Sequence, residues 1–487
     1  MNDDQCDLVV RNGTIIDGSG APRFVGDVAI SGTRITKVGD IGAMPSIREI
    51  DARGLMVAPG FIDVHSHDDA ALIARPEMAP KLTQGVTTVI CGNCGISGAP
   101  YSSPGNPPGL LRLLFKSDRF VAPSFAEYAG KVSDAGPSIN AGFLTGHSTL
   151  RMQVMGKELD RGASAEEIAQ MRGLLVECLE AGSLGLSTGL FYPPARAAPT
   201  EEIIRLGEPL AAYSGVYVTH MRDEADKVME SVQETLEIGR ALRVPVIISH
   251  HKCMGRRNFG RSVQTLALLE DSRSNQPLAL DLYPYTAGSS ILAEEFVAQS
   301  SQTLITWCEP YPDYCGRDLA DIAREWKCRP VETVAKLQPA GALYFMMDEE
   351  DVTRIMRFPM TMIGSDGLPE DTHPHPRLWG TFPRILGRYV RERGVLSLED
   401  AVNRMTGLPA TQFKIDRRGE IKSGNYADLC IFDPRLIHDA ATYEEPTRPS
   451  VGIRYVLVNG QVALDEGQRT GTRAGRILRR CAAGTVN

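Results

Sequence analysis

The 487-residue sequence lacks any apolar run of the roughly 18 residues that a membrane-spanning helix needs. It also lacks the basic start and apolar stretch of a secretion signal, since it begins Met-Asn-Asp-Asp-Gln. Ten cysteines are scattered along the chain and do not form the dense pattern of a disulfide framework. These absences predict a cytoplasmic protein that does not bind a membrane.

An excess of basic residues is absent as well. The chain has 52 Lys and Arg against 60 Asp and Glu, a net charge of −8 at pH 7. Four arginines lie close together near the C-terminus, but we interpret residues 473–480 as a solvated terminal face. The charge balance therefore argues against a nucleic-acid partner. The sequence also shows no phosphate-binding glycine loop and no internal repeat.

Short strand-like runs are concentrated at both ends of the chain. Residues 7–52 alternate such runs with turns, and the clearest C-terminal strands are expected at residues 427–433 and 455–462. Neither segment is long enough to hold a core alone. We therefore predict that they pair as one small β-sandwich domain built from residues 1–54 and 415–487.

Between these ends, residues 55–414 alternate apolar runs with helical stretches, a pattern typical of βα units. Eight strands are expected, at residues 56–64, 86–91, 139–145, 184–187, 216–220, 245–250, 278–282 and 360–365. Eight such units predict an α/β fold, a closed (β/α)8 barrel of the TIM type, with active groups at the carboxyl ends of its strands. The connection between the seventh and eighth strands is unusually long, and we expect an insertion at about residues 285–350.

Metal-binding side chains follow five of the expected strands. They are His65 and His67 after the first strand, Cys94 after the second, His220 after the fifth, His250 after the sixth and Asp366 after the eighth. Alternate residues of an extended segment share a face, so His65 and His67 point the same way. A single histidine after a strand usually has a structural role. Because several strands end in the same way, a purely structural role for all of these histidines is improbable. Imidazole, thiolate and carboxylate together favour zinc over calcium or magnesium.

Residues 61–67, Phe-Ile-Asp-Val-His-Ser-His, resemble the opening motif of the amidohydrolase superfamily. Longer motifs narrow the resemblance to the N-acyl-D-amino-acid deacylases, or D-aminoacylases. They are Gly92-Asn93-Cys94-Gly95-Ile96-Ser97, Thr219-His220-Met221-Arg222-Asp223-Glu224, Ile248-Ser249-His250-His251-Lys252, Gly364-Ser365-Asp366-Gly367-Leu368-Pro369 and His373-Pro374-His375-Pro376-Arg377-Leu378-Trp379-Gly380. The likeness covers nearly the whole chain, including both β segments.

The resemblance implies one tightly held zinc ion and a second, weaker position. The implied ligands are Cys94, His220 and His250 for the first, and His65, His67 and Asp366 for the second, with Cys94 able to bridge. Many superfamily members bridge two metals through a carboxylated lysine after the fourth strand, but residues 184–188 contain no lysine. The deacylase family has a cysteine after the second strand instead, so this departure supports the narrower resemblance.

The resemblance implies hydrolysis of N-acyl-D-amino acids to a carboxylate and a free D-amino acid. Zinc lowers the pKa of its bound water toward about 7 and polarises the amide carbonyl. Asp366 would accept the proton of that water as general base and pass it to the leaving nitrogen as general acid. Its alternative role is a helix N-cap in the Ser-Asp-Gly turn. The preference for D over L follows from the resemblance alone.

An amino-acid product carries an α-carboxylate, so its pocket needs fixed cations or hydroxyl groups. Lys252 and Arg377 are the candidate cations, and Tyr283 and Ser289 are additional donors. The resemblance supports Lys252, Tyr283 and Arg377 in this role. The alternative for Arg377, apart from the resemblance, is a surface ion pair.

The predicted substrate pocket also has an apolar part, for which the candidates are Phe191, Tyr192, Tyr344 and Met347. The alternative is that they are ordinary core residues around the insertion. Residues 294–295, both glutamates, would repel an acidic substrate side chain if they pointed inward. We therefore expect neutral, hydrophobic D-residues such as leucine, methionine or phenylalanine.

Residues 185–189 match the Gly-x-Ser-x-Gly elbow of serine hydrolases, but Phe-Tyr-Pro-Pro at 191–194 follows where a helix would have to begin. Two rival functions remain. The first is a cyclic-amide hydrolase of the dihydroorotase or hydantoinase type on the same barrel, against which the missing lysine and the presence of Cys94 argue. The second is a non-catalytic scaffold, which should have lost ligands, whereas every expected ligand is present.

Overall fold

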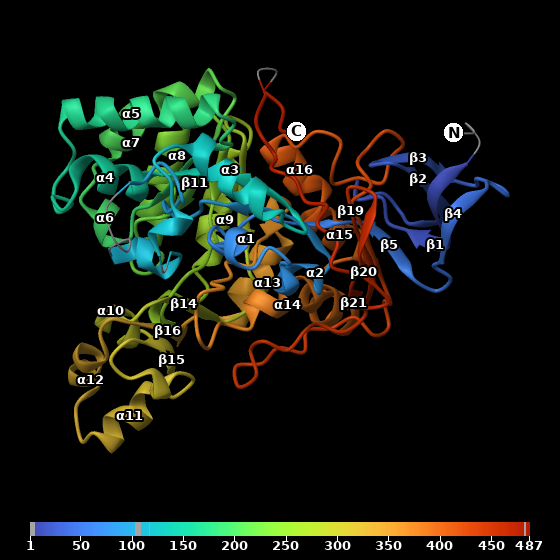
Figure 1. Ribbon diagram of the computed structural model, residues 1–487. Coiled ribbons are helices and arrows are strands. Elements are labelled where there is room, and N and C mark those ends of the chain that lie inside the picture. The colour runs from blue at the N-terminus through green and yellow to red at the C-terminus, as the bar shows by residue number, and fades with distance from the viewer. Residues whose placement is uncertain (1–4, 103–108, 116, 482–483) are drawn as a thin grey trace.

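Strands from the two ends of the chain share one sheet in the computed structural model, which describes residues 5–102, 109–115, 117–481 and 484–487 (Figure 1). Its order is β21-β20-β19-β18-β5-β1-β2-β3, with β4 paired to β1. The bounds are β1 Cys6–Ile15, β2 Phe24–Ser31, β3 Arg34–Gly39, β4 Ser46–Asp51, β5 Met56–Pro59, β18 Leu429–Phe432, β19 Ile453–Val458, β20 Gln461–Asp465 and β21 Gln468–Arg469. Hydrogen bonds join all nine strands into one sheet that branches at β1, and the β-sandwich expected from the sequence stays a prediction.

Parallel strands occupy the middle of the chain, in the orders β6-β7-β8 and β17-β13-β12-β11-β10-β9. Their bounds are β6 Phe61–Asp63, β7 Val86–Cys91, β8 Asn140–Phe143, β9 Thr145–Gly146, β10 Gly185–Gly189, β11 Val216–His220, β12 Val246–Ile248, β13 Leu278–Leu282 and β17 Thr361–Ile363. All eight expected positions contain strand, and the third is divided into β8 and β9. The first and last strands lie together, because the Asp366 amide donates to the His65 carbonyl at 2.7 Å and Ser66 forms a parallel bridge with Gly367.

The first expected strand, at residues 56–64, is broken at Gly60. Before the break, β5 pairs with β1 and β18 of the terminal sheet; after it, β6 pairs with β7. The Gly60 amide donates to the Asp428 carbonyl at 2.8 Å, and a Cβ atom at Gly60 would lie only 2.2 Å from the Thr87 side chain. A glycine is therefore needed where the chain passes between the two sheets.

Helices follow most of the parallel strands and cover them. Their bounds are α1 Ala71–Ala74, α2 Ala79–Leu82, α3 Phe125–Ala135, α4 His147–Met155, α5 Ala165–Glu180, α6 Pro193–Arg196, α7 Thr200–Gly207, α8 Val228–Leu242, α9 Ser262–Ser272, α13 Glu349–Arg357, α14 Arg377–Arg384, α15 Leu398–Met405 and α16 Gly407–Phe413. The capping box expected from Ser164 and Glu167 is present at the start of α5. Within the described ranges, no helix combines the length and apolar character needed to cross a membrane.

The long connection between β13 and β17 forms a separate lobe, coloured yellow in Figure 1. It contains an antiparallel sheet of order β14-β16-β15, made of β14 Ala287–Ile291, β15 Thr303–Cys308 and β16 Ala340–Phe345. Three short helices accompany the sheet: α10 Glu294–Val297, α11 Leu319–Glu325 and α12 Pro330–Leu337. Because β14 begins five residues after β13 ends, this lobe lies close to the carboxyl ends of the parallel strands.

Candidate metal centre and catalytic site

The expected metal ligands from four strand ends meet at the sulfur atom of Cys94. Cys94 Sγ lies 3.3 Å from His65 Nε2, 3.4 Å from His250 Nε2 and 3.7 Å from His220 Nδ1. Zn–S bonds of about 2.3 Å and Zn–N bonds of about 2.0–2.1 Å at a tetrahedral angle separate sulfur from nitrogen by about 3.5 Å. Each observed separation therefore fits a histidine nitrogen that binds the same zinc ion as the Cys94 sulfur.

Asp366 completes the group on the side of the first strand. Its Oδ1 lies 3.1 Å from His67 Nε2 and 3.5 Å from His65 Nε2. Ligand atoms of His65, Cys94, His250 and Asp366 all lie within 4.8 Å of one another, and all four side chains are buried. The six residues predicted from separate strand ends therefore lie in one place.

The charges in this group favour the forms that bind a metal. Burial would raise the pKa of the Cys94 thiol, but His65 and His250 outweigh burial and hold that pKa well below its ordinary value. Burial would likewise raise the pKa of Asp366, and Arg377 with the neighbouring histidines holds it well below its ordinary range. Thiolate and carboxylate are the ionised forms that coordinate a cation.

Three of these residues adopt a left-handed backbone conformation. The φ angles are 54° at Cys94, 35° at His250 and 48° at Asp366. Such a conformation is rare for a residue with a side chain, costs about 1–3 kcal/mol and is concentrated at functional sites. It turns the chain sharply where each strand ends.

The Gly-Asn-Cys-Gly loop around Cys94 is held by close backbone approaches. A Cβ atom at Gly92 would lie 2.2 Å from the Leu144 carbonyl oxygen, and one at Gly95 would lie 2.8 Å from the Gly189 amide. The buried Ser187 hydroxyl donates to the Gly92 carbonyl and accepts the Gly95 amide at 3.1 Å. Ser187, the serine of the Gly-x-Ser-x-Gly match, thus holds the cysteine loop by hydrogen bonds. This structural role argues against Ser187 as the nucleophile of a serine hydrolase.

The sequence did not reveal the buried carboxylates that orient the ligands. Asp281, in the apolar strand β13, accepts the His250 amide at 2.9 Å and lies 3.3 Å from His65 Nδ1. Asp63 accepts the Ser365 amide at 2.8 Å and pairs with the fully buried Lys81 at 2.7 Å. Outer partners of this kind fix the ring orientation of metal-binding histidines. The one available signal was a charged residue inside an apolar strand, as at Asp281.

Glu224 is a second residue that the sequence did not single out. Its carboxylate accepts hydrogen bonds from Lys252 Nζ at 2.8 and 2.9 Å, and lies 3.1 Å from His250 Nδ1 and 3.6 Å from His220 Nε2. Burial would raise its pKa, but Lys252 and the two histidines hold it far below the ordinary value. Lys252, a predicted cation for the substrate carboxylate, thus lies against the buried carboxylate of Glu224, which also faces two expected zinc ligands.

We expect Glu224→Gln to weaken zinc binding about 10–100-fold, because loss of an outer-shell partner has effects of this size. Competition with a chromophoric chelator measures the zinc dissociation constant directly. Glu270→Gln is the control, since Glu270 is an exposed residue that pairs with Arg273 on the surface. Equal zinc affinity in the wild type and the Glu224 variant would remove Glu224 from this role.

Arg377 is buried beside Asp366 and does not form the surface ion pair that was the alternative. Its Nη1 lies 2.9 Å from Asp366 Oδ2, and its guanidinium group lies 4.4 Å above the Tyr283 ring. None of its three nitrogens makes a well-directed hydrogen bond to the residues that the structure describes. The same holds for the buried Ser289 hydroxyl. Arg377 therefore has donor capacity beyond its ion pair with Asp366, and a ligand beside it can accept hydrogen bonds from it and from Ser289.

The predicted apolar residues divide into two groups. Phe191 and Tyr192 lie beside the metal centre, with rings 5.9 and 4.8 Å from the His220 ring. Met347 packs against Tyr283. Tyr344 belongs to the core of the inserted lobe, where its hydroxyl donates to the Ile291 carbonyl at 2.7 Å.

Residues 294–295 do not point into the site. Both glutamates are exposed, and Glu295 forms an ion pair with Arg196 at 3.2 Å. The repulsion of acidic substrates that we expected from inward-pointing glutamates is therefore wrong, because α10 presents these two residues to solvent. Any preference for neutral side chains must rest on the apolar residues around His220.

The comparisons with known proteins agree with this geometry. Residues 48–251 and 321–464 match the model of the amidohydrolase family. The chain is 50% identical to a D-aminoacylase of Alcaligenes xylosoxydans xylosoxydans, a match that covers 98% of both proteins. It is 47% identical to an N-acyl-D-aspartate deacylase of the same organism, a match that covers 97% of this chain and 95% of that protein. It is 45% identical to an N-acyl-D-glutamate deacylase of that organism, over 99% of this chain and 98% of that protein.

Solved structures give the same result. A crystal structure of a D-aminoacylase superimposes with a TM-score of 0.95 at 51% identity, covering 98% of this chain and all of the other. An N-acyl-D-glutamate deacylase from Bordetella bronchiseptica, complexed with zinc and a phosphonate inhibitor, superimposes with a TM-score of 0.94 at 43% identity over 98% of this chain and 100% of that one. The chain therefore belongs to the amidohydrolase family, in the group of the N-acyl-D-amino-acid deacylases.

Proposed function

We propose that the protein hydrolyses the amide bond of N-acyl-D-amino acids and releases a carboxylate and a free D-amino acid. The observation that carries this proposal is the convergence of Cys94, the four histidines and Asp366 on one buried point, with the unused donors of Arg377 beside it. A site of this kind combines a metal centre, a proton acceptor and a cation for the product carboxylate. Membership of a family of hydrolases supports the same reaction class.

We also propose that the eight parallel strand positions close into a (β/α)8 barrel. The contacts of His65 and Ser66 with residues after β17 support this arrangement, because they connect the first strand with the last. Residues 415–487 and the N-terminal strands form the small β domain. Since β5 pairs with that sheet, we draw the boundary at Gly60 and not at residue 55. The inserted lobe follows β13.

The donor set fits zinc. Cys94, His220 and His250 would hold one ion, and His65, His67 and Asp366 a second, weaker one, with Cys94 shared between them. When bound, zinc supplies positive charge that polarises the amide carbonyl and promotes ionisation of water. Asp281 and Glu224 orient the histidine rings from behind.

Asp366 moves the proton in this proposal. Its carboxylate accepts a proton from the attacking water as general base and then donates it to the leaving nitrogen as general acid. Arg377 and the histidines keep the pKa of Asp366 low, so the carboxylate is ionised at neutral pH. Amide hydrolysis needs both transfers, because an unprotonated amide nitrogen is a poor leaving group.

Arg377 is the principal anchor for the α-carboxylate of the substrate. It is buried, stacked on Tyr283 and free of well-directed hydrogen bonds to the described residues, so its planar group can receive a carboxylate. The hydroxyl groups of Tyr283 and Ser289 add donors nearby. Lys252 contributes less to binding, because its Nζ already donates hydrogen bonds to both carboxylate oxygens of Glu224, whereas Arg377 makes no well-directed hydrogen bond to the described residues.

We expect Arg377→Met to raise KM for N-acetyl-D-methionine about 10–100-fold, since hydrogen bonds to charged groups contribute about 1.5–3 kcal/mol. Lys252→Met should raise KM less than tenfold. Steady-state kinetics at fixed zinc measures both, with the exposed Arg324→Met as control. An unchanged KM in both variants would rule out the carboxylate anchor.

The apolar rings of Phe191 and Tyr192, together with Met347, support a preference for neutral, hydrophobic D-residues. A panel of N-acetyl-D- and N-acetyl-L-amino acids tests function and preference together. We expect zinc-loaded enzyme to cleave the D-leucine, D-methionine and D-phenylalanine derivatives fastest. A D-glutamate preference would overturn the side-chain proposal. The proposed function would be overturned if the enzyme cleaved no N-acyl-D- or N-acyl-L-amino acid and opened the ring of a dihydropyrimidine instead.

A further inference from the structure

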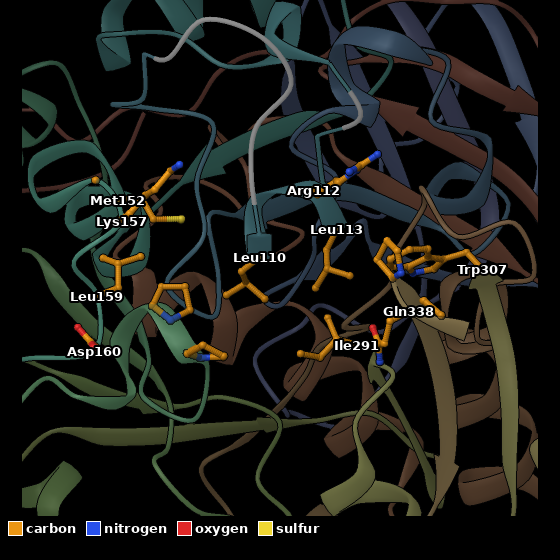
Figure 2. Close-up of a pocket in the computed structure, with 15 residues that line it drawn as sticks. Leu110, Arg112, Leu113, Met152, Lys157, Leu159, Asp160, Ile291, Trp307 and Gln338 are labelled. Atoms are coloured by element: carbon orange, nitrogen blue, oxygen red, sulfur yellow. The ribbon is translucent and has the colours of Figure 1, made fainter. Parts of the chain in front are cut away.

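A large apolar cavity of about 730 Å³ lies between the barrel side of the molecule and the inserted lobe (Figure 2). Leu110, Leu113, Met152, Leu159, Ile291 and Trp307 contribute most of its apolar wall. Figure 2 shows Leu110, Leu113 and Ile291 directed toward the same space from different segments. The volume is in the range of about 300–1,000 Å³ that is typical of small-molecule sites. We name it the Leu110–Ile291 cavity.

The wall of this cavity and the apolar wall of the catalytic site belong to one hydrophobic cluster. Cys94 and Tyr192 pack in the same hydrophobic cluster as Leu110 and Trp307, and Ile291 packs against it. The residues that directly follow Tyr192, Pro193 and Pro194, line the cavity. The Tyr192 ring itself lies 4.8 Å from the His220 ring. One side of Tyr192 therefore faces the metal centre, while the chain just after it bounds the cavity.

Strand β14 links the carboxylate anchor to the cavity. At its beginning, the Ala287 carbonyl lies 3.0 Å from His375 Nε2, and a Cβ atom at Gly288 would lie 3.4 Å from the Tyr283 hydroxyl. At its end, Ile291 lines the cavity. A rise of about 3.3 Å per residue places Gly288 and Ile291 about 10 Å apart. Ser289 lies between these positions, on the same strand face as Ile291. Its hydroxyl has no hydrogen-bond partner among the residues that the structure describes.

We propose that the Leu110–Ile291 cavity receives the aliphatic chain of the N-acyl group, so that the enzyme prefers acyl chains of about six to eight carbons over acetyl. The inference rests on the proposed function. A substrate with its carboxylate at Arg377 and Tyr283 uses roughly one extended residue, about 3.3–3.6 Å, to reach its amide. Several methylene groups are then needed to reach Ile291. An acetyl group ends before the cavity and leaves it unfilled.

The test measures kcat/KM of zinc-loaded enzyme for N-acetyl-, N-butanoyl-, N-hexanoyl- and N-octanoyl-D-leucine. Burial of each methylene group should raise kcat/KM about two- to fourfold from butanoyl to octanoyl. Ile291→Trp places a large ring in the cavity and should reduce the ratio of octanoyl to acetyl kcat/KM at least tenfold. Leu436→Trp, at an exposed apolar position, is the control and should keep the wild-type ratio.

A wild-type ratio of one or less would overturn the inference, as would an Ile291→Trp ratio equal to that of the wild type. Both results leave acetyl hydrolysis, and with it the proposed function, intact. Failure to cleave any member of the series would contradict the proposed function instead. If Ile291→Trp does not fold, as judged by its thermal melting curve, Leu159→Trp, at another residue that lines the cavity, provides the same measurement.

Discussion

Replacement of Asp366 by asparagine is expected to lower kcat about 10²–10⁴-fold, the usual contribution of a positioned general acid–base group. Asparagine keeps the shape of the side chain and tolerates the φ of 48° at this position, but it cannot accept the proton of the attacking water. The measurement is kcat at saturating N-acetyl-D-methionine, with zinc content determined in the same sample.

The exposed Asp321→Asn is the control, because Asp321 pairs with Arg324 on the surface. The Asp366 variant also leaves the buried Arg377 without its anionic partner, so we expect its free energy of unfolding to fall by up to about 3–5 kcal/mol. The kinetics must therefore be measured well below its unfolding temperature. Near-wild-type turnover with zinc retained would exclude Asp366 as the base and leave it as a metal ligand and the ion-pair partner of Arg377. The N-cap alternative is wrong, because the described chain contains no helix between Asp366 and α14, which begins at Arg377.

Replacement of Cys94 by alanine is expected to remove the tightly held zinc. Cys94 Sγ is the atom to which His65, His220 and His250 all approach within 3.7 Å, so its loss takes away the shared donor of the group. We expect zinc affinity to fall by more than the 10–100-fold that loss of an outer-shell partner causes. Zinc per chain after dialysis, measured by atomic emission, and kcat/KM on the same sample test this expectation.

Cys178→Ala is a matched control, since Cys178 is also a buried cysteine but lies in α5. It should retain zinc and activity. Full zinc occupancy in the Cys94 variant would contradict a ligand role for that cysteine. Zinc loss without loss of activity would separate the metal from the reaction and overturn the proposed mechanism as a whole.

The six expected ligands could be predicted from the sequence because each follows an apolar run that forms a buried strand. The carboxyl ends of parallel strands meet at one edge, so side chains such as Cys94 and His250 converge although they are far apart along the chain. The break at Gly60 could not be predicted, because residues on both of its sides are apolar and buried. Apolar character alone does not show that the chain moves from one sheet to another.

The supporting residues were not predictable for a different reason. Glu224, Asp281 and Lys81 act through contacts with residues distant in the sequence, as in the pairing of Glu224 with Lys252. No periodic pattern marks such contacts before the fold brings them together. The exposure of residues 294–295 could not be predicted from the sequence either. They lie in a four-residue helix, which is too short for a sequence pattern to show which face is exposed.

The left-handed turns at Cys94, His250 and Asp366 have a consequence for how this protein can change. Glycine would relieve the torsional penalty at each position, yet it would supply neither sulfur, imidazole nor carboxylate. Laboratory selection for heat resistance alone, with no demand for turnover, should therefore enrich glycine at Cys94 and His250, but not at Asp366, where loss of the buried ion pair with Arg377 costs more than the torsional relief gains. At Cys94 and His250, the backbone conformation that lowers thermal stability is the one that presents the metal-binding side chain.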